Sequence, residues 1–149
     1  LVLMLEPHSD KDKVEMLLNQ LLSIEPNSPT YLNAYAYTLA LQNRRLDDAR
    51  RFVEHALEYA PEQASILDTL GFICYLQNDF STSAKVLEKA YLISGSVNIG
   101  VRYARSVYML GDLQKFSTVL QQLKQKHPND PQLDQLNTLL LPQQLKKSS

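Results

Sequence analysis

The feature that most constrains this chain is an internal repeat of about 34 residues. Four series of small, apolar or helix-ending residues run in parallel through the sequence, and each advances by 35, then 34, then 33 positions. One alignment accounts for all four series, which indicates that a single structural unit recurs. The series are Val14, Ala49, Ser83 and Phe116; Leu18, Val53, Leu87 and Leu120; Leu21, Ala56, Ala90 and Leu123; and Pro26, Pro61, Gly95 and Pro128. Such a period is typical of solenoids, in which one supersecondary unit stacks on the next.

Each unit has the spacing of two helices joined by a short turn. In the segments 46–60 and 80–93 the apolar residues fall at steps of three and four, as on one face of a helix. Another segment with helical spacing precedes each of these. The joints Asn43–Arg45, Gln77–Asp79 and Leu110–Asp112 are short, so the two helices of a unit are expected to pack antiparallel.

Small residues at fixed places predict close helix packing. Ala36, Gly71 and Ala104 lie on the first helix of successive units. Ala49 and Ala56 lie on a second helix, and at all five places a short side chain lets the partner helix approach. A large residue in place of Gly71 should overpack the hairpin at a cost of about 1 to 3 kcal/mol.

We therefore predict an all-α chain folded as one antiparallel helix-hairpin solenoid over residues 1–141. Four glycines and seven prolines offer too little turn chemistry for a β-sandwich or a Gly-rich nucleotide-binding fold. Because the sequence opens within an apolar stretch and without Met, we expect it to be part of a longer protein, with any targeting segment beyond it. The expected units are 11–28 as the second helix of a partial repeat, 29–63, 64–96 and 97–130 as full repeats, 131–141 as a C-terminal capping helix, and 142–149 as a flexible tail.

The repeat resembles the tetratricopeptide repeat (TPR) family over about residues 11 to 130. The residues that carry the resemblance are Leu67, Leu70, Gly71, Tyr75, Phe80, Ala84 and Ala90 in one unit, and Leu32, Ala36, Ala49, Ala56 and Pro61 in the unit before it. The resemblance implies a superhelix whose first helices line a concave face. Ser83 stands where Ala is usual, Phe116 and Leu123 replace small residues, and no Trp occurs. These departures leave the packing of the last unit open.

A second resemblance concerns multi-repeat proteins of the bacterial envelope. The strings Arg45–Ala49, His55–Leu57 and Ile66–Phe72, with Pro61 between the last two, are similar to theirs. In those proteins the repeats accompany lipoprotein, polysaccharide-export or secretion machinery. The resemblance implies a role in a bacterial assembly, secretion or export system. It favours a periplasmic or envelope-associated location over a cytoplasmic one, while the compartment itself is left open.

The net charge of the chain argues against a nucleic-acid partner, and the short apolar opening argues against insertion into a membrane. A net charge of −1 offers no general electrostatic attraction to nucleic acid. The basic residues Arg44, Arg45, Arg50 and Arg51 are interspersed with acidic ones and are expected to form a solvated helix face. The apolar opening, Leu1–Leu5, is far shorter than the roughly 20 residues of a membrane span, so we expect no direct membrane insertion.

No group of residues indicates catalysis, a cofactor or a metal. His8, His55 and His127 are far apart, and none has a second ligand at metal-binding spacing. The single cysteine, Cys74, lies on an apolar stripe with no nearby His and is expected to be a small core residue. The four glycines are isolated and form no phosphate-binding loop. We therefore predict that the chain is not an enzyme.

The predicted functional feature is the concave face formed by the first helices. Its aromatic residues are expected to form a ladder that suits a protein partner, either a helix or an extended peptide, because Tyr and Arg commonly anchor interfaces. The candidate partner-binding residues are Asn33, Tyr37, Leu41, Asp68, Phe72, Tyr75, Arg105, Tyr108 and Met109, with Ala40, Ser65, Leu76, Asn98 and Val101 beside them.

Two alternatives concern the same surfaces. In the first, the groove would be filled by the chain's own neighbouring helix, by a part of the parent chain beyond this sequence, or by another copy. In the second, helices exposed at the truncated repeat ends would pair with another copy. Either would make the chain a structural or self-association domain. The Lys and Asn set with which some TPR proteins clamp the carboxylate tail of chaperones is absent, since the three first helices contain no lysine. Capture of that tail is therefore not expected.

Overall fold

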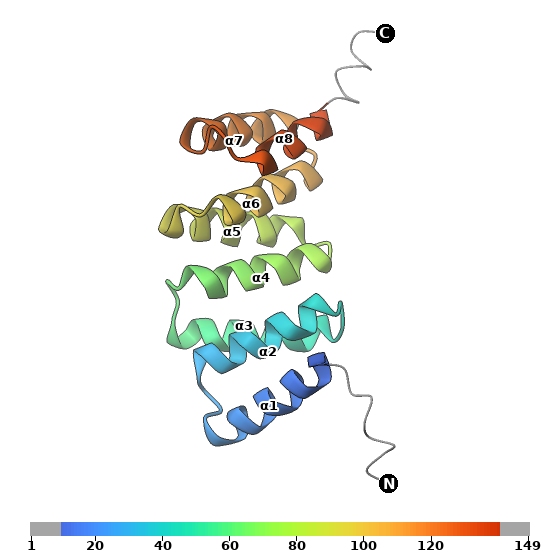
Figure 1. The fold of residues 1–149 in the computed structure, drawn as a ribbon, viewed down its shortest axis with the longest axis vertical. Helices are drawn as coiled ribbons and strands as arrows, with labels where there is room; N and C mark the ends of the chain where they lie inside the picture. The colour runs from blue at the N-terminus through green and yellow to red at the C-terminus, as the bar shows by residue number, and fades with distance from the viewer. Residues whose placement is uncertain (1–9, 141–149) are drawn as a thin grey trace.

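The computed structural model describes residues 10–140, and its regular elements are all helical. Figure 1 shows the helices stacked along the long axis of the molecule in the order of the sequence. The expectations for His8, for the opening Leu1–Leu5 and for the tail 142–149 lie outside the described residues. The elements are α1 (Asp10–Ile24), α2 (Pro29–Leu41), α3 (Leu46–Tyr59), α4 (Ala64–Leu76), α5 (Phe80–Ser94), α6 (Val97–Met109), α7 (Leu113–Lys126), α8 (Pro131–Asn137) and the 3-10 turn η2 (Thr138–Leu140).

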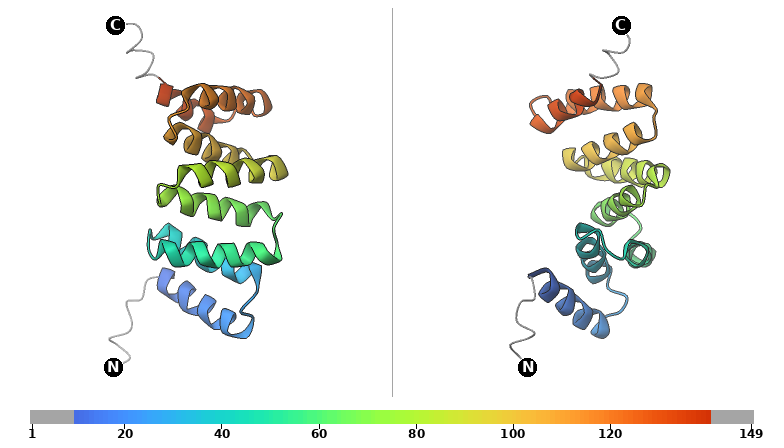
Figure 2. Two further views of the ribbon diagram at one scale, coloured as in Figure 1. Left: turned by 180° about the vertical axis from the view of Figure 1, so that it is seen from behind. Right: turned by 90° about the vertical axis from the view of Figure 1, so that its right-hand side faces the viewer.

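The helices pack as antiparallel hairpins that stack on one another. α2 pairs with α3, α4 with α5 and α6 with α7, while α3 also packs on α4 and α5 on α6. α1 packs on α2, as the second helix of an incomplete unit does. Figure 2 shows the same stack from behind and from the side. The predicted all-α helix-hairpin solenoid is confirmed.

The C-terminal helix covers one end of the stack. α8 lies against α6 and α7 and buries Leu133 and Leu136. The side chain of Asp130 caps its first turn by accepting a backbone hydrogen bond. Where the sequence predicts a capping helix over 131–141, the chain is α-helical only to Asn137 and continues as η2.

The hairpin turns each contain a left-handed residue at an equivalent place. Asn43, Asn78 and Gly111 have φ angles of 50°, 64° and 85°, a region that Asn and Gly adopt at little cost. The turn between α2 and α3 is one residue longer than the other two. It contains a second left-handed residue, Arg45, with a φ angle of 50°.

Close packing within the second repeat depends on Gly71. A Cβ atom built on Gly71 would lie 2.5 Å from Cδ2 of Leu87, well inside van der Waals contact. α4 and α5 therefore approach this closely because α4 has no side chain here. In the first repeat Ala36 takes the place of Gly71 and Val53 takes the place of Leu87, and both are fully buried. The larger side chain of Ala36 is thus matched by a partner, Val53, that is shorter than leucine.

The third repeat exchanges the large and the small residue of another contact. Gly100 on α6 takes the place of Leu67, and Leu123 on α7 takes the place of Ala90. A Cβ atom on Gly100 would lie 2.5 Å from Cδ2 of Leu123, which is itself buried. Phe116, the other large replacement on α7, is also fully buried. The last unit thus packs closely by moving the small residue from the second helix to the first.

Ser83, the remaining departure from the TPR pattern, links three helices. Its hydroxyl donates a hydrogen bond to the carbonyl oxygen of Gly71 on α4 at 2.7 Å and lies 2.8 Å from the hydroxyl oxygen of Ser106 on α6. Both serines are fully buried. Because both hydroxyls have partners, the core holds them without the cost of an unpaired polar group. Ser83 therefore joins the second repeat to the third.

We predict that the exchange in the third repeat can be reversed. Gly100→Leu alone should overpack the hairpin and cost about 1 to 3 kcal/mol, and Leu123→Ala alone should leave a cavity and cost about 2 to 5 kcal/mol. The double variant restores the order of Leu67 and Ala90 and should recover about half of the combined loss or more. Urea denaturation followed by circular dichroism measures the three free energies of unfolding. A double variant that loses the sum of the two single losses would show no coupling between the residues.

A further prediction concerns the start of α5. Asp79 caps this helix by accepting a hydrogen bond from the backbone N–H of Thr82 at 3.3 Å, and it forms an ion pair with Arg50 at 3.1 Å. Hydrogen bonding from Thr82, with a smaller contribution from Arg50, lowers the pKa of Asp79 below its ordinary value. The folded state then holds this proton less tightly than the unfolded state. The resulting stabilisation is present above the unfolded pKa and is lost as the pH falls through the folded pKa.

Asp79→Ala should cost about 1 kcal/mol at pH 7, because the N-cap acceptor is lost. The difference in unfolding free energy between this variant and the wild type should shrink as the pH is lowered from about 7 to about 3, across the ordinary pKa of aspartate. Urea titrations at a series of pH values measure it. A difference that stays constant over this range would contradict the assigned role of the carboxylate.

Candidate partner-binding groove

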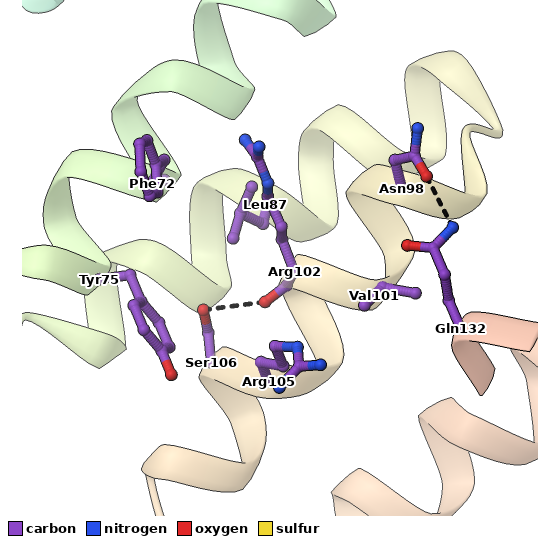
Figure 3. Close-up of a pocket in the computed structure, with 10 residues that line it drawn as sticks. Phe72, Tyr75, Leu87, Asn98, Val101, Arg102, Arg105, Ser106 and Gln132 are labelled. Carbon is purple, nitrogen blue, oxygen red and sulfur yellow. Dashed lines mark hydrogen bonds between the residues drawn. The ribbon is translucent and has the colours of Figure 1, made fainter. Parts of the chain in front are cut away.

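Two adjoining pockets lie along the first helices of the repeats. One, of about 400 Å³, lies between α4, α6 and α8, and Figure 3 shows the side chains around it. The other, also of about 400 Å³, lies between α2 and α4. Arg102 lines both pockets, so together they form one continuous surface, the groove.

The predicted residues fall into three groups in the structure. Those that line the pocket between α2 and α4 are Asn33, Tyr37, Ser65 and Asp68. Those that line the pocket between α4, α6 and α8 are Phe72, Tyr75, Asn98, Val101 and Arg105. Those that line neither pocket are Leu41, Leu76, Tyr108 and Met109, of which Leu41 and Met109 are about half exposed at the ends of their helices, at 55% and 46%. The expectation that Ala40 lies on the groove surface is wrong, because it is buried among the core residues around α2 and α3.

A short ladder of flat side chains crosses the groove. The rings of Tyr37 and Phe72 lie 6.2 Å apart, and the guanidinium carbon of Arg102 lies 5.0 Å from the centre of the Phe72 ring. The sequence predicts Tyr75 and Tyr108 as further members of an aromatic ladder. Each packs edge-on against a ring of the following helix, at 5.3 Å, and of the two only Tyr75 also lines a groove pocket. The ladder that crosses the groove therefore consists of Tyr37, Phe72 and Arg102.

Arg102 is held in place by Asp68. Its Nη1 atom donates to both carboxylate oxygens of Asp68 at 3.1 Å, which joins α6 to α4 across the groove. Burial raises the pKa of Asp68, and the charge and hydrogen bonds of Arg102 offset this only in part. Removing Arg102 would therefore leave a carboxylate that is poorly solvated and unpaired.

Sequence reasoning missed Arg102, although a signal was present. Asp68 is the only charged residue of a mostly apolar first helix, and a carboxylate in such a place needs a cation on a neighbouring element. Arg102 follows it by 34 residues, which is about one repeat, so the stacking of equivalent helices brings the two together. Gln132 of α8 gave no such signal, because its hydrogen bond to Asn98, at 2.8 Å, depends on how α8 docks.

Two groups in the groove lack a partner within residues 10–140. The guanidinium of Arg105 makes no hydrogen bond or ion pair there, although it lines the pocket between α4, α6 and α8. The Oδ1 atom of Asn33, in the other pocket, is buried and accepts no hydrogen bond. A buried acceptor without a donor costs free energy. Of the two groups, the half-buried guanidinium of Arg105 is the one directly accessible to a ligand.

The remaining reactive side chains have structural surroundings. Cys74 is fully buried, and burial raises the pKa of its thiol to about 11, so it is protonated at neutral pH. His55 lies 2.8 Å from the side-chain oxygen of Asn27, and His127 lies 3.5 Å from the hydroxyl of Tyr91. Within residues 10–140 no cluster of His, Cys, Asp and Glu could hold a metal ion. In the same range no helix combines the length and the apolar character needed to cross a membrane.

The four clustered arginines are paired with acidic side chains. Arg44 forms an ion pair with Glu15 of α1, and Arg50 with Asp79 and with Glu54. The remaining two arginines, Arg45 and Arg51, both form ion pairs with Asp48. The cluster therefore carries little uncompensated positive charge.

The fold and the pockets define a helical-repeat solenoid with a groove along its first helices. No protein-family model matches the chain. Among curated proteins it is similar to the TPR repeat-containing protein PA4667 of Pseudomonas aeruginosa, with 32% identity over 85 residues. The match covers 57% of this chain and 14% of that protein, so the chain spans only a small part of the length of its relative.

Solved structures show the same fold. The chain is similar to TTC0263, a thermophilic TPR protein of Thermus thermophilus, with a TM-score of 0.72 and 17% identity over 85% of this chain and 71% of that one. It is also similar to MamA, with a TM-score of 0.71 and 12% identity over 95% of this chain and 98% of that one. The resemblance to the TPR family is confirmed, and the chain folds as a TPR superhelix.

Proposed function

We propose that this chain is a protein-protein interaction scaffold that binds a partner helix or an extended peptide in the groove. The TPR fold supports a protein-interaction scaffold in general. The observation that carries the finer proposal is the ladder of Tyr37, Phe72 and Arg102, which crosses α2, α4 and α6 and lines both pockets. Aromatic and guanidinium groups are the side chains that most often anchor protein interfaces.

The extent of the groove favours a segment of polypeptide over a small molecule. Its two pockets adjoin across three successive first helices and combine apolar surface with amide, hydroxyl and guanidinium groups. A small-molecule site is more often a single concave and mostly apolar cavity. An extended or helical segment can place alternate side chains in the two pockets while its backbone follows the ladder.

We extend the proposal to the parent protein, as a larger multi-repeat member of a bacterial assembly, secretion or export system. Its support is the similarity to a much longer bacterial TPR protein, together with the strings that resemble envelope-associated repeats. An enzymatic role is not proposed, because Cys74 is buried and protonated. A nucleic-acid partner is not proposed either, because the clustered arginines are paired with acidic side chains.

A second candidate function is self-association through the face of α1. Val14 and Leu17 on this helix are about half exposed, at 45% and 54%. The residues equivalent to Val14 in the full repeats, Ala49, Ser83 and Phe116, are fully buried under a first helix. α1 therefore presents an apolar face of the kind that another copy can cover.

Sedimentation velocity over a range of concentrations tests this second candidate. If α1 mediates self-association, the chain should form dimers, and Leu17→Glu should shift it to monomer, because a charge then enters the paired face. Thr118→Glu, at an exposed position on α7, is the matched control. A wild-type chain that stays monomeric at the highest concentration would rule out self-association of this chain.

Groove binding is tested by selecting ligands from a displayed library of random 12-residue peptides. Peptides selected on the wild-type chain should lose about tenfold or more in affinity for Phe72→Ala and for Tyr37→Ala, because the ladder anchors them. Tyr59→Ala is the matched control, since Tyr59 is a half-exposed tyrosine on α3 outside the groove. Fluorescence anisotropy measures the affinities, and circular dichroism confirms that each variant is folded. Selected peptides that bind all four proteins equally would contradict groove binding.

A further inference from the structure

We propose that the pocket between α4, α6 and α8 takes an acidic side chain of the bound segment, whose carboxylate pairs with the guanidinium of Arg105. The inference rests on the proposed function, because it names the chemistry of the segment that the groove binds. The partner is then a protein segment in which Asp or Glu stands near apolar residues. The support comes from the charges of the pocket, from the unused donors of Arg105 and from the row of groove positions to which Arg105 belongs.

The charges around this pocket have one sign. Its charged lining residues are Arg102 and Arg105, and neither Asp nor Glu lines it. Phe72, Tyr75 and Val101 contribute apolar surface beside them, which displaces part of the surrounding water and strengthens a charge pair relative to one in bulk solvent. This arrangement stands out in a chain whose net charge is −1. An anionic side chain entering the pocket meets two guanidinium groups and no like charge among the lining residues.

The two arginines differ in what they already bind. Arg102 is engaged by both oxygens of Asp68 and by the face of Phe72. Arg105, one helical turn further along α6, makes no hydrogen bond or ion pair within residues 10–140. A guanidinium offers planar, paired donors that match a carboxylate, and such charge-assisted hydrogen bonds are stronger than neutral ones. Arg105 is therefore the residue of this pocket that is ready to bind a carboxylate.

The repeat places Arg105 in line with the aromatic residues of the ladder. Tyr37, Phe72 and Arg105 occupy the same position of three successive repeats, at separations of 35 and 33 residues. The first two rings lie in contact with each other across the groove. A segment lying along this row meets two rings and then a cation. It is best complemented by apolar side chains followed by an acidic one.

The other pocket complements the backbone of the same segment. Asn33 lines this pocket, and its buried Oδ1 atom has no hydrogen-bond donor. A peptide N–H, which every segment of polypeptide supplies, can reach this atom once the Asn33 side chain rotates toward the pocket. The thermodynamic gain is larger than for an exposed acceptor, because an unsatisfied buried group already carries a cost. Asn33 and Arg105 thus provide an acceptor at one end of the groove and a donor group at the other.

A polyanion such as nucleic acid fits this surface less well. Binding to a phosphate backbone depends on several cations that each neutralise a phosphate. The groove holds one unpaired guanidinium, and Arg44, Arg45, Arg50 and Arg51 are paired with carboxylates away from it. A single carboxylate on a folded or extended protein segment matches what the groove offers.

The peptide library described above tests the inference with the 149-residue chain. The peptides are fused through their C-termini to the display protein, so no terminal carboxylate takes part. Peptides selected on the wild type should contain more Asp and Glu than the unselected library. The strongest peptide is then synthesised with amidated ends, together with its counterpart in which Glu becomes Gln and Asp becomes Asn.

The wild-type chain should bind the acidic peptide about tenfold more tightly than its neutral counterpart, as expected for a hydrogen bond to a charged group. Arg105→Gln should abolish this preference while leaving the affinity for the neutral counterpart unchanged. Arg51→Gln, at an exposed arginine of α3, should retain the preference. The preference should also weaken between about 50 and 500 mM salt, because the pair is partly exposed.

The other outcomes separate the two proposals. Peptides that depend on Phe72 but show no acidic enrichment, or a preference that survives in Arg105→Gln, would overturn the role of Arg105 and leave groove binding standing. A library that yields no peptide dependent on Phe72 or Tyr37 would overturn both. Binding of a labelled single-stranded oligonucleotide that is lost in Arg105→Gln would assign the residue to a polyanion and would also overturn the inference.

Discussion

The structure depends on one steric rule: the two helices of a hairpin approach closely only where the side chains that meet between them have complementary sizes. In the second repeat the small residue is Gly71, and it receives the side chain of Leu87. In the third, Gly100 receives the side chain of Leu123. Because close-packed interiors leave little room for adjustment, this pairing controls how near the helices lie. It thereby controls how the first helices line up to form the groove.

Most of the fold could be predicted from the sequence, because periodicity is a local property. Steps of three and four residues define the helices, and the 34-residue repeat defines their pairing. The sequence alone could not show how the last unit accommodates Leu123 and Phe116. In the structure Gly100 on the first helix makes room for Leu123 on the second. An alignment of the repeats compares one position at a time, so it does not show that changes at two different positions compensate each other. Ser83 is similar: as a replacement for alanine it is unexplained until α6 brings Ser106 within 2.8 Å.

The candidate site could be predicted less completely, because its contacts cross from one repeat to the next. Helical periodicity assigns Tyr37 and Phe72 to one surface, and their rings meet there. It could not show that Tyr75, while lining a groove pocket, also packs against Phe80, since that contact depends on how the hairpin closes. Arg102 was missed for a related reason. A residue one repeat away becomes a neighbour only after the solenoid has stacked.

The pairing of Asp68 with Arg102 also gives the groove a direction. Asp68 and Arg102 both line the pocket between α2 and α4, and their charges compensate each other there. No carboxylate lines the pocket between α4, α6 and α8, and Arg105 is unpaired there within the described residues 10–140. Under the proposed binding mode, an acidic side chain is therefore attracted to the pocket that holds Arg105 more than to the pocket with the compensated pair, and specificity grows from the difference between these two energies. Because Asp68 already neutralises Arg102, the distinction between the two ends depends on Arg105 alone, one helical turn away on the same helix.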